Sequence, residues 1–295
     1  MHLVQQCPIC DHGQFIKKID CKDYTVSHET FAITECQHCG LLLTNPQPER
    51  NLLEKYYLSD DYISHTNKPK TLIDLIYKIS RGITLNWKYN LIHKYQRYSP
   101  IKVLDFGSGT GNFLKKCFKR GDQAFGIEPS EKARTIANQE TGLTIFSSLQ
   151  ELKQRVNVIT AWHVLEHVPD PLGTLKNLND KLEQTGTMFI AVPNHNSYDA
   201  LLYKEQWAGY DVPRHLWHFS KQDMSRLLAK SGFDLIDILP MKLDAFYVSL
   251  LSEKYIDGKT TIAGLFKGFI NGLLSNLKGR RTINHSSLIY IAKKK

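Results

Sequence analysis

The chain has 295 residues, of which 42% are hydrophobic and 23% are charged, a composition typical of a globular protein. The length allows one large α/β domain with an accessory module, or two modest domains. No stretch reaches the ~18 uninterrupted apolar residues of a membrane-spanning helix. The formal net charge of +9 favours acidic partners such as nucleotides, nucleic acid or anionic lipid headgroups, although the basic residues are scattered along the chain.

The first segment carries two Cys-x-x-Cys pairs, Cys7 with Cys10 and Cys36 with Cys39. The chain opens without a positive start followed by an apolar run, so we expect a cytoplasmic protein, in which paired thiols bind metal more often than they form disulfides. Two such pairs can complete a closed four-thiolate site of the structural zinc type. We therefore predict a zinc-binding module over residues 1–48, with a small hairpin near residues 31–34. Cys21 and Cys117 have no such partner and are expected to be small buried side chains.

Residues 49–98 form the second predicted segment, a helical linker or lid. Pro46 and Pro48 break the chain before it. Apolar residues then recur at helical spacing, which predicts a helix over residues 71–98. This helix either packs passively on the next domain or covers the mouth of its site.

From residue 101 onward, strands alternate with helices, which predicts a mostly parallel sheet covered on both faces. Ligands of such sheets bind at the carboxyl ends of the strands. Strands are expected at residues 102–107, 124–128, 143–146, 156–162 and 187–192, and helices at 112–119, 131–140 and 172–182.

The first of these strands leads into a glycine loop, and the second ends on an acid. The loop reads Asp105-Phe106-Gly107-Ser108-Gly109-Thr110-Gly111, and Glu128 follows at the spacing at which a carboxylate receives ribose hydroxyls. Both a nicotinamide dinucleotide and S-adenosylmethionine present such a ribose. A dinucleotide loop has a glycine where Asn112 stands, and an acid before the first glycine suits a cationic ligand better than a pyrophosphate.

Three segments in order resemble the motifs of class I S-adenosylmethionine-dependent methyltransferases, which have a Rossmann-like sheet of seven strands. They are residues 103–111, 126–130 and 162–170, and the resemblance covers roughly residues 101–192. It implies that S-adenosylmethionine is the methyl donor. Many family members carry an acid where Ser147 and Ser148 stand. By this resemblance the donor-binding residues are Asp105, Phe106, Gly107, Ser108, Gly109, Gly111, Glu128, Pro129, Ser148, Leu149, His163 and Val164.

A sulfonium methyl group is already electrophilic, so the protein must exclude water, align the acceptor and remove a proton where one is lost. The candidate bases lie after the fourth and fifth strands. They are His163, Glu166, His167, His195, His215 and His218, and we take His163, His167 and His215 as the catalytic candidates.

The C-terminal third predicts a helix over 221–231 and strands over 233–239 and 287–292, separated by an insertion at about 246–283. In the insertion an apolar helical stripe runs over residues 262–277, beside a narrow row of Gly264, Gly268 and Gly272. The helix either packs on protein, its own core or a second subunit, or rests on a membrane through residues 262–278. The methyltransferase domain is thus expected to span residues 99–295.

The leading hypothesis is O- or C-methylation of a small molecule. The zinc-headed arrangement resembles sugar C-methyltransferases of deoxysugar pathways, and the catalytic half looks like quinone-type O-methyltransferases. Two alternatives stay open: an RNA methyltransferase, with which the net charge agrees, and a donor-binding module without catalysis. The Asn/Asp-Pro-Pro-aromatic loop of many base-amino methyltransferases is absent, because Trp162, His163 and Val164 stand there.

Overall fold

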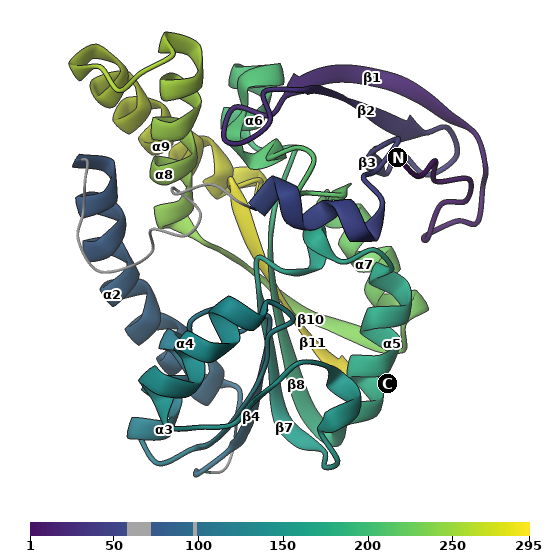
Figure 1. Cartoon of the computed structure of the whole chain (residues 1–295), viewed down its shortest axis with the longest axis vertical. Coiled ribbons are helices and arrows are strands. Elements are labelled where there is room, and N and C mark those ends of the chain that lie inside the picture. The colour runs from purple at the N-terminus through teal and green to yellow at the C-terminus, as the bar shows by residue number, and fades with distance from the viewer. Residues whose placement is uncertain (58–71, 97–98) are drawn as a thin grey trace.

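A computed structural model describes residues 1–57, 72–96 and 99–295 (Figure 1). It contains a small N-terminal sheet and a large central sheet. The part of the predicted linker at residues 58–71 and 97–98 lies outside the described residues. No described helix is long and apolar enough to cross a membrane.

The central sheet has seven strands in the order β10-β11-β8-β7-β4-β5-β6. Only β11 runs antiparallel to its two neighbours, so the predicted mostly parallel, Rossmann-like sheet is confirmed. The strands are β4 (Lys102–Phe106), β5 (Gln123–Ile127), β6 (Ile145–Phe146), β7 (Val156–Trp162), β8 (Leu182–Pro193), β10 (Phe233–Pro240) and β11 (Ser287–Lys294).

Helices cover both faces of this sheet (Figure 1). One apolar core joins α2 (Leu72–Lys94) and α3 (Asn112–Lys119) to the sheet, and α4 (Glu131–Thr141) packs beside α3. The opposite core joins α5 (Pro171–Lys181) and α7 (Lys221–Lys230) to the sheet. The strand order reverses between β4 and its neighbours β5 and β7, which is the position where open α/β sheets bind ligands.

The small sheet joins the N-terminal module to the rest of the chain. Its order is β1-β2-β3-β9, with β1 (Phe15–Lys22), β2 (Thr30–Cys36), β3 (Leu42–Thr44) and β9 (Trp217–His218). Leu42 pairs with His218, and Leu43 pairs with Trp217, although the two strands lie far apart in the sequence. The module is therefore continuous with the large domain through a shared pair of strands.

Short helices complete the loops around the carboxyl ends of the strands. They are η1 (Arg50–Tyr57), η2 (Leu149–Glu151), η3 (Leu165–His167), α6 (Tyr198–Tyr203), η4 (Lys204–Gln206) and η5 (Ala208–Tyr210).

The C-terminal insertion is a pair of helices, α8 (Lys242–Asp257) and α9 (Ile262–Thr282), which stand beyond the end of the sheet (Figure 1). The row of small residues, not the apolar stripe, is the buried face of α9: a Cβ at Gly268 would lie 2.9 Å from the Cα of Leu250 on α8, and one at Gly272 would lie 2.8 Å from the Cα of Phe246. The large apolar side chains face outward, with Phe266 67% and Phe269 57% exposed.

Candidate functional site

The glycine loop follows β4 and needs glycine because of its backbone geometry. Gly107, Gly109 and Gly111 have φ of 77°, 52° and 77°, the left-handed region that side chains with a Cβ rarely adopt. A Cβ at Gly107 would lie 2.5 Å from a methyl carbon of Val164, whereas one at Gly109 would meet no described atom within 4 Å. The loop thus packs against Val164 on one side and leaves its backbone open at Gly109.

Glu128 follows β5, and its carboxylate is held by this loop. Oε2 accepts from the backbone N–H of Gly109 at 2.8 Å, and Oε1 accepts from that of Ser130 at 2.9 Å. Burial raises the pKa of Glu128 and outweighs the opposing effect of these two hydrogen bonds. A carboxylate oxygen has two lone pairs, so each oxygen can still accept a hydroxyl donor.

Asp105 lies under the loop with its side chain buried. The hydroxyl of Thr160 on β7 donates to its Oδ1 at 2.7 Å. Burial raises the pKa of Asp105 to about 7, against the lowering effects of Thr160 and of the Lys88 ammonium. Lys88 of α2 lies 4.4 Å from the centroid of the Trp162 ring, and burial lowers its pKa to about 8 although Asp244 and Asp105 favour its charge. The carboxylates of Asp105 and Asp244 therefore lie near the Lys88 ammonium.

His163 follows β7 and connects this region to a second group of polar side chains. Its φ of 58° is unusual for a residue with a Cβ, and such conformations cluster at functional sites. Nε2 contacts Oδ2 of Asp244 at 2.9 Å, and Nδ1 contacts Oε1 of Glu166 at 3.3 Å. Burial alone would lower the pKa of His163, but these carboxylates raise it to about 9. At neutral pH the ring is therefore protonated and donates from both nitrogens.

The residues expected beside the adenine lie after β6. Leu149 is buried, and the preceding turn is closed by Glu151. Oε1 of Glu151 accepts from the backbone N–H groups of Ser147 and Ser148 and from both hydroxyls, at 2.5–3.1 Å. An acid is thus present at this edge, although it comes from a position three residues after Ser148.

His167 and His215 lie against one another beyond His163, with ring centroids 4.6 Å apart. Nδ1 of His167 is 3.0 Å from the carbonyl oxygen of Arg214 and 3.0 Å from the hydroxyl of Tyr57. Nδ1 of His215 is 2.9 Å from the carbonyl oxygen of Gly209. Burial lowers the pKa of His167 to about 4, so its imidazole is neutral at physiological pH.

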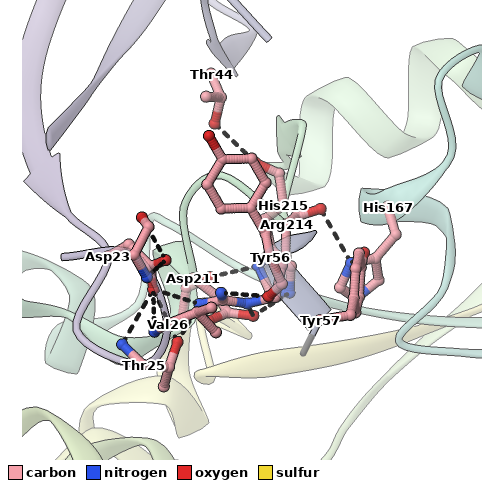
Figure 2. Close-up of polar contacts among 12 residues, drawn as sticks. Asp23, Thr25, Val26, Thr44, Tyr56, Tyr57, His167, Asp211, Arg214 and His215 are labelled. Atoms are coloured by element: carbon pink, nitrogen blue, oxygen red, sulfur yellow. Dashed lines mark hydrogen bonds and ion pairs between the residues drawn. The ribbon is translucent and has the colours of Figure 1, made fainter. Parts of the chain in front are cut away.

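The side chain of Arg214 anchors this region to the N-terminal module. This side chain is 1% exposed. It lies between the carboxylates of Asp23 and Asp211 (Figure 2). It donates to Asp23 at 3.0 Å and to Asp211 at 2.6 and 3.0 Å, as well as to the carbonyl of Tyr56 and the hydroxyl of Thr25. Asp23 comes from the loop between β1 and β2, so this ion pair joins segments far apart in the sequence.

The other candidate bases lie elsewhere. His218 is on β9, where Nε2 is 3.1 Å from the hydroxyl of Thr44, and burial lowers its pKa well below the usual value. Nε2 of His195 is 3.8 Å from Asp223 at the start of α7. The structure therefore brings together His163, Glu166, His167 and His215.

Several residues at this site were missed by the sequence analysis, namely Lys88, Asp23, Tyr57 and Asp244. Asp244 lies in the first turn of α8, just before the insertion expected at about residues 246–283. No motif marks any of the four.

The predicted metal-ligand cysteines form one group. The Sγ atoms of Cys7, Cys10, Cys36 and Cys39 all lie within 4.8 Å of one another, with Cys7–Cys39 and Cys10–Cys36 contacts of 3.5 Å. Bonds of 2.3 Å to a tetrahedral zinc ion place thiolates about 3.8 Å apart, so these four fit that ion. Cys21 and Cys117 are buried outside the group, as predicted.

Comparison with known proteins identifies the large domain. Residues 74–238 match the profile of the family described as methyltransferase domain. A ubiquinone biosynthesis O-methyltransferase from Azoarcus sp. is 29% identical over 157 residues, which are 48% of this chain and 67% of that protein. One with the same description from Nitrosospira multiformis is 26% identical over 166 residues, 51% of this chain and 70% of that protein.

Solved structures share the fold. A magnesium protoporphyrin IX methyltransferase from Synechocystis, crystallised with bound S-adenosylmethionine, has a TM-score of 0.54 at 13% identity and covers 85% of this chain and 100% of its own. A mycolic acid cyclopropane synthase has a TM-score of 0.56 at 12% identity, covering 84% of this chain and 99% of its own.

Proposed function

This chain belongs to the methyltransferase domain family, and from that premise we propose which residues bind the methyl donor and which class of acceptor it serves. The protein is an S-adenosylmethionine-dependent methyltransferase. The observation that supports our assignment of the donor site is the contact between Glu128 and the Gly109 backbone, which fixes a carboxylate beside an open stretch of loop.

We assign Asp105, Phe106, Gly107, Ser108, Gly109 and Gly111 to the methionine end of the donor, and Glu128 with Pro129 to its ribose. Ser148 and Leu149 would lie beside the adenine, and His163 with Val164 would lie near the sulfonium. The residues fit this ligand in two respects. Buried Ser108 Oγ has no hydrogen-bond partner among the described residues, and the carboxylates of Asp105 and Asp244 suit a cation.

The donor supplies a methyl group on positively charged sulfur, which leaves as a neutral thioether when the acceptor's electron pair forms the new bond. The chain's own residues align the acceptor, exclude water and deal with the acceptor's proton. Protonated His163 holds its position between Asp244 and Glu166 as a hydrogen-bond donor. We propose that neutral His167 and its neighbour His215 lie on the acceptor side of His163.

We favour a hydroxyl of a small molecule as the acceptor because the relatives from Azoarcus sp. and Nitrosospira multiformis are described as O-methyltransferases. Incubation of the full chain with labelled donor and pools of phenols, sugars and lipid-linked quinol precursors, followed by mass analysis, tests this choice. A product methylated on carbon, or methyl transfer only to RNA, would contradict it.

Glu128→Ala tests the donor site. Loss of two ribose hydrogen bonds should weaken S-adenosylmethionine binding by about 1–3 kcal/mol in calorimetry. Glu140→Ala is the matched control, since Glu140 is an exposed acid on α4 that pairs with Lys115. Unchanged donor affinity in Glu128→Ala, or tight uptake of a nicotinamide dinucleotide in place of the sulfonium nucleoside, would overturn the assignment.

We propose that Cys7, Cys10, Cys36 and Cys39 hold a structural zinc ion. Cys10→Ser should reduce the intensity of the thiolate-to-cobalt charge-transfer band of protein refolded with Co²⁺, because three thiolates remain in place of four, whereas Cys117→Ala, which replaces a buried cysteine outside the group, should keep the full intensity. Equal band intensity in Cys10→Ser and the unsubstituted protein would refute the site.

We further propose that α9 contacts an anionic membrane surface. Its outward stripe, including Ile262, Phe266 and Leu273, is apolar, and the helix carries Lys267, Lys278, Arg280 and Arg281 but no acid. Phe266→Glu with Leu273→Glu should reduce co-sedimentation with vesicles containing phosphatidylglycerol, and Ile16→Glu, an exposed residue of β1, should not. Sedimentation that is unchanged by the double substitution would exclude this contact.

A further inference from the structure

A second cluster of ligand-type side chains lies apart from the cysteines. Glu166, His167 and His215 each place one ligand atom within 4.8 Å of the others. Two segments supply them, η3 and the turn before β9. The backbone N–H of Leu216 donates to the carbonyl of Glu166 at 2.8 Å, which fixes these two segments side by side.

Both histidines are oriented by backbone carbonyls. A carbonyl oxygen can only accept, so the contact of Gly209 with Nδ1 of His215 places the proton of a neutral ring on that nitrogen. The Arg214 carbonyl favours the same tautomer for His167, whose Nδ1 also lies 3.0 Å from the Tyr57 hydroxyl, a group that can accept from the same N–H. The lone pair of each ring then lies on Nε2. Metal-binding histidines commonly have this arrangement, in which a second partner fixes the tautomer and presents the other nitrogen to the ion.

Glu166 is fully buried and only partly satisfied. Its Oε1 is 3.3 Å from Nδ1 of His163 and 4.0 Å from Nε2 of His215. Its Oε2 is buried and has no hydrogen-bond partner among the described residues. A buried carboxylate oxygen without a partner is costly, so Oε2 would gain from bonding to a ligand at this position.

We propose that Glu166, His167 and His215 bind one divalent first-row transition-metal ion. Two imidazoles and one carboxylate suit Zn²⁺, Fe²⁺, Co²⁺ or Mn²⁺ better than Ca²⁺, which prefers oxygen ligands alone. Atoms bonded to one such ion at about 2.0–2.2 Å are at most about 4.4 Å apart, and the 4.0 Å between Oε1 of Glu166 and Nε2 of His215 falls within that limit. Three protein ligands leave coordination positions open to water or to an acceptor oxygen.

The position of the ion gives it a role in methyl transfer, and this part of the inference rests on the proposed function. Glu166 contacts His163, which we place near the sulfonium, so the metal lies at the acceptor side. A hydroxyl bound to a divalent cation loses its proton more easily than a free hydroxyl. The ion would thus orient the acceptor oxygen and favour its anionic form.

Cobalt titration of the full chain, with zinc already in the cysteine site, tests the metal site without donor or acceptor. We expect one additional Co²⁺ per chain, with visible d–d bands and no thiolate-to-cobalt charge transfer. His215→Gln and Glu166→Gln should each weaken this binding at least ~10-fold, since loss of even an outer partner of a metal ligand costs that much. His285→Gln is the matched control, because His285 is a buried histidine at the end of α9 that contacts Asn276.

A second measurement uses the unsubstituted protein and therefore does not depend on the folding of any variant. Pulsed electron paramagnetic resonance of bound Mn²⁺ should show coupling to directly bonded imidazole nitrogens. No cobalt beyond the thiolate site, unchanged affinity in His215→Gln, or Mn²⁺ without nitrogen coupling would each overturn the proposal. None of these measurements uses methyl transfer, so a negative result would count against the metal site and not against the methyltransferase function. Loss of donor binding in Glu128→Ala, in turn, should leave cobalt binding at the metal site unchanged.

Discussion

The donor half and the acceptor half of this site are built in different ways. The donor half comes mainly from one continuous segment between Asp105 and Leu149, and its key contact is between a carboxylate and a backbone N–H. The acceptor half combines side chains from distant segments, with Arg214 joined to Asp23, and it meets the donor half at His163, which is joined to Asp244. The donor half therefore depends on local geometry, and the acceptor half depends on the docking of the N-terminal module and of α8.

The largest effect is expected for Arg214→Met. Removing the guanidinium leaves Asp23 and Asp211 as carboxylates without their buried partner, and breaking such a pair costs about 3–5 kcal/mol. Urea unfolding should show this loss. The matched control is Lys18→Met, which removes an exposed ion pair with Glu35 and should cost less than ~1 kcal/mol. Equal losses in the two variants would mean that the buried position of the Arg214 ion pairs adds nothing to the stability of the acceptor half.

Gly107→Ala should damage the donor half alone. The left-handed backbone costs about 1–2 kcal/mol for a residue with a Cβ, and this Cβ also meets Val164 at 2.5 Å. Gly121→Ala is the control, because Gly121 has a φ of 95° but an open Cβ position in a turn away from the loop. Calorimetry should show at least a ~10-fold loss of donor affinity for Gly107→Ala and none for Gly121→Ala. Cobalt binding at Glu166 should survive in both.

Acid should weaken the acceptor half gradually. Burial would raise the pKa of Asp23, but hydrogen bonds from Arg214 and from the Ser27 and Thr25 backbone lower it below the ordinary value. A carboxyl with a lowered folded-state pKa contributes stability that is present above the unfolded-state pKa and lost as the pH falls toward the folded-state pKa. Unfolding free energy should therefore decrease below about pH 4, and the decrease should be smaller in Asp23→Asn. An identical acid profile in that variant would contradict this account.

The smallest effect is expected for Ser130→Ala, a local change at the start of α4. Its side chain accepts from the N–H of Ala133, and loss of such a cap costs about 0.5–2 kcal/mol. The acceptor half should be unaffected, with cobalt affinity as in the wild type. Ser130→Gly should lose only a few tenths of a kcal/mol, and a change in cobalt affinity in either variant would show that the halves are coupled.

The same contrast explains what the sequence could predict. The alternation of strand and helix patterns over residues 101–192 predicts α3 and β7 with the bounds that the structure shows, because glycine turns and apolar periodicity are local signals. Strand β9 has two residues and no pattern of its own, and it exists because Trp217 and His218 pair with β3. Periodicity revealed both faces of α9 but not which one is buried, since glycine packs closely on α8 only when a neighbouring helix is present.

The strand pairing between β3 and β9 has a practical consequence for anyone who trims the chain. Removal of residues 1–48 would remove β3, with which β9 pairs, and would expose an unpaired strand edge that favours aggregation. It would also remove Asp23, an ion-pair partner of Arg214. The cysteine module is therefore part of the folded enzyme, and its removal should destabilise the acceptor half.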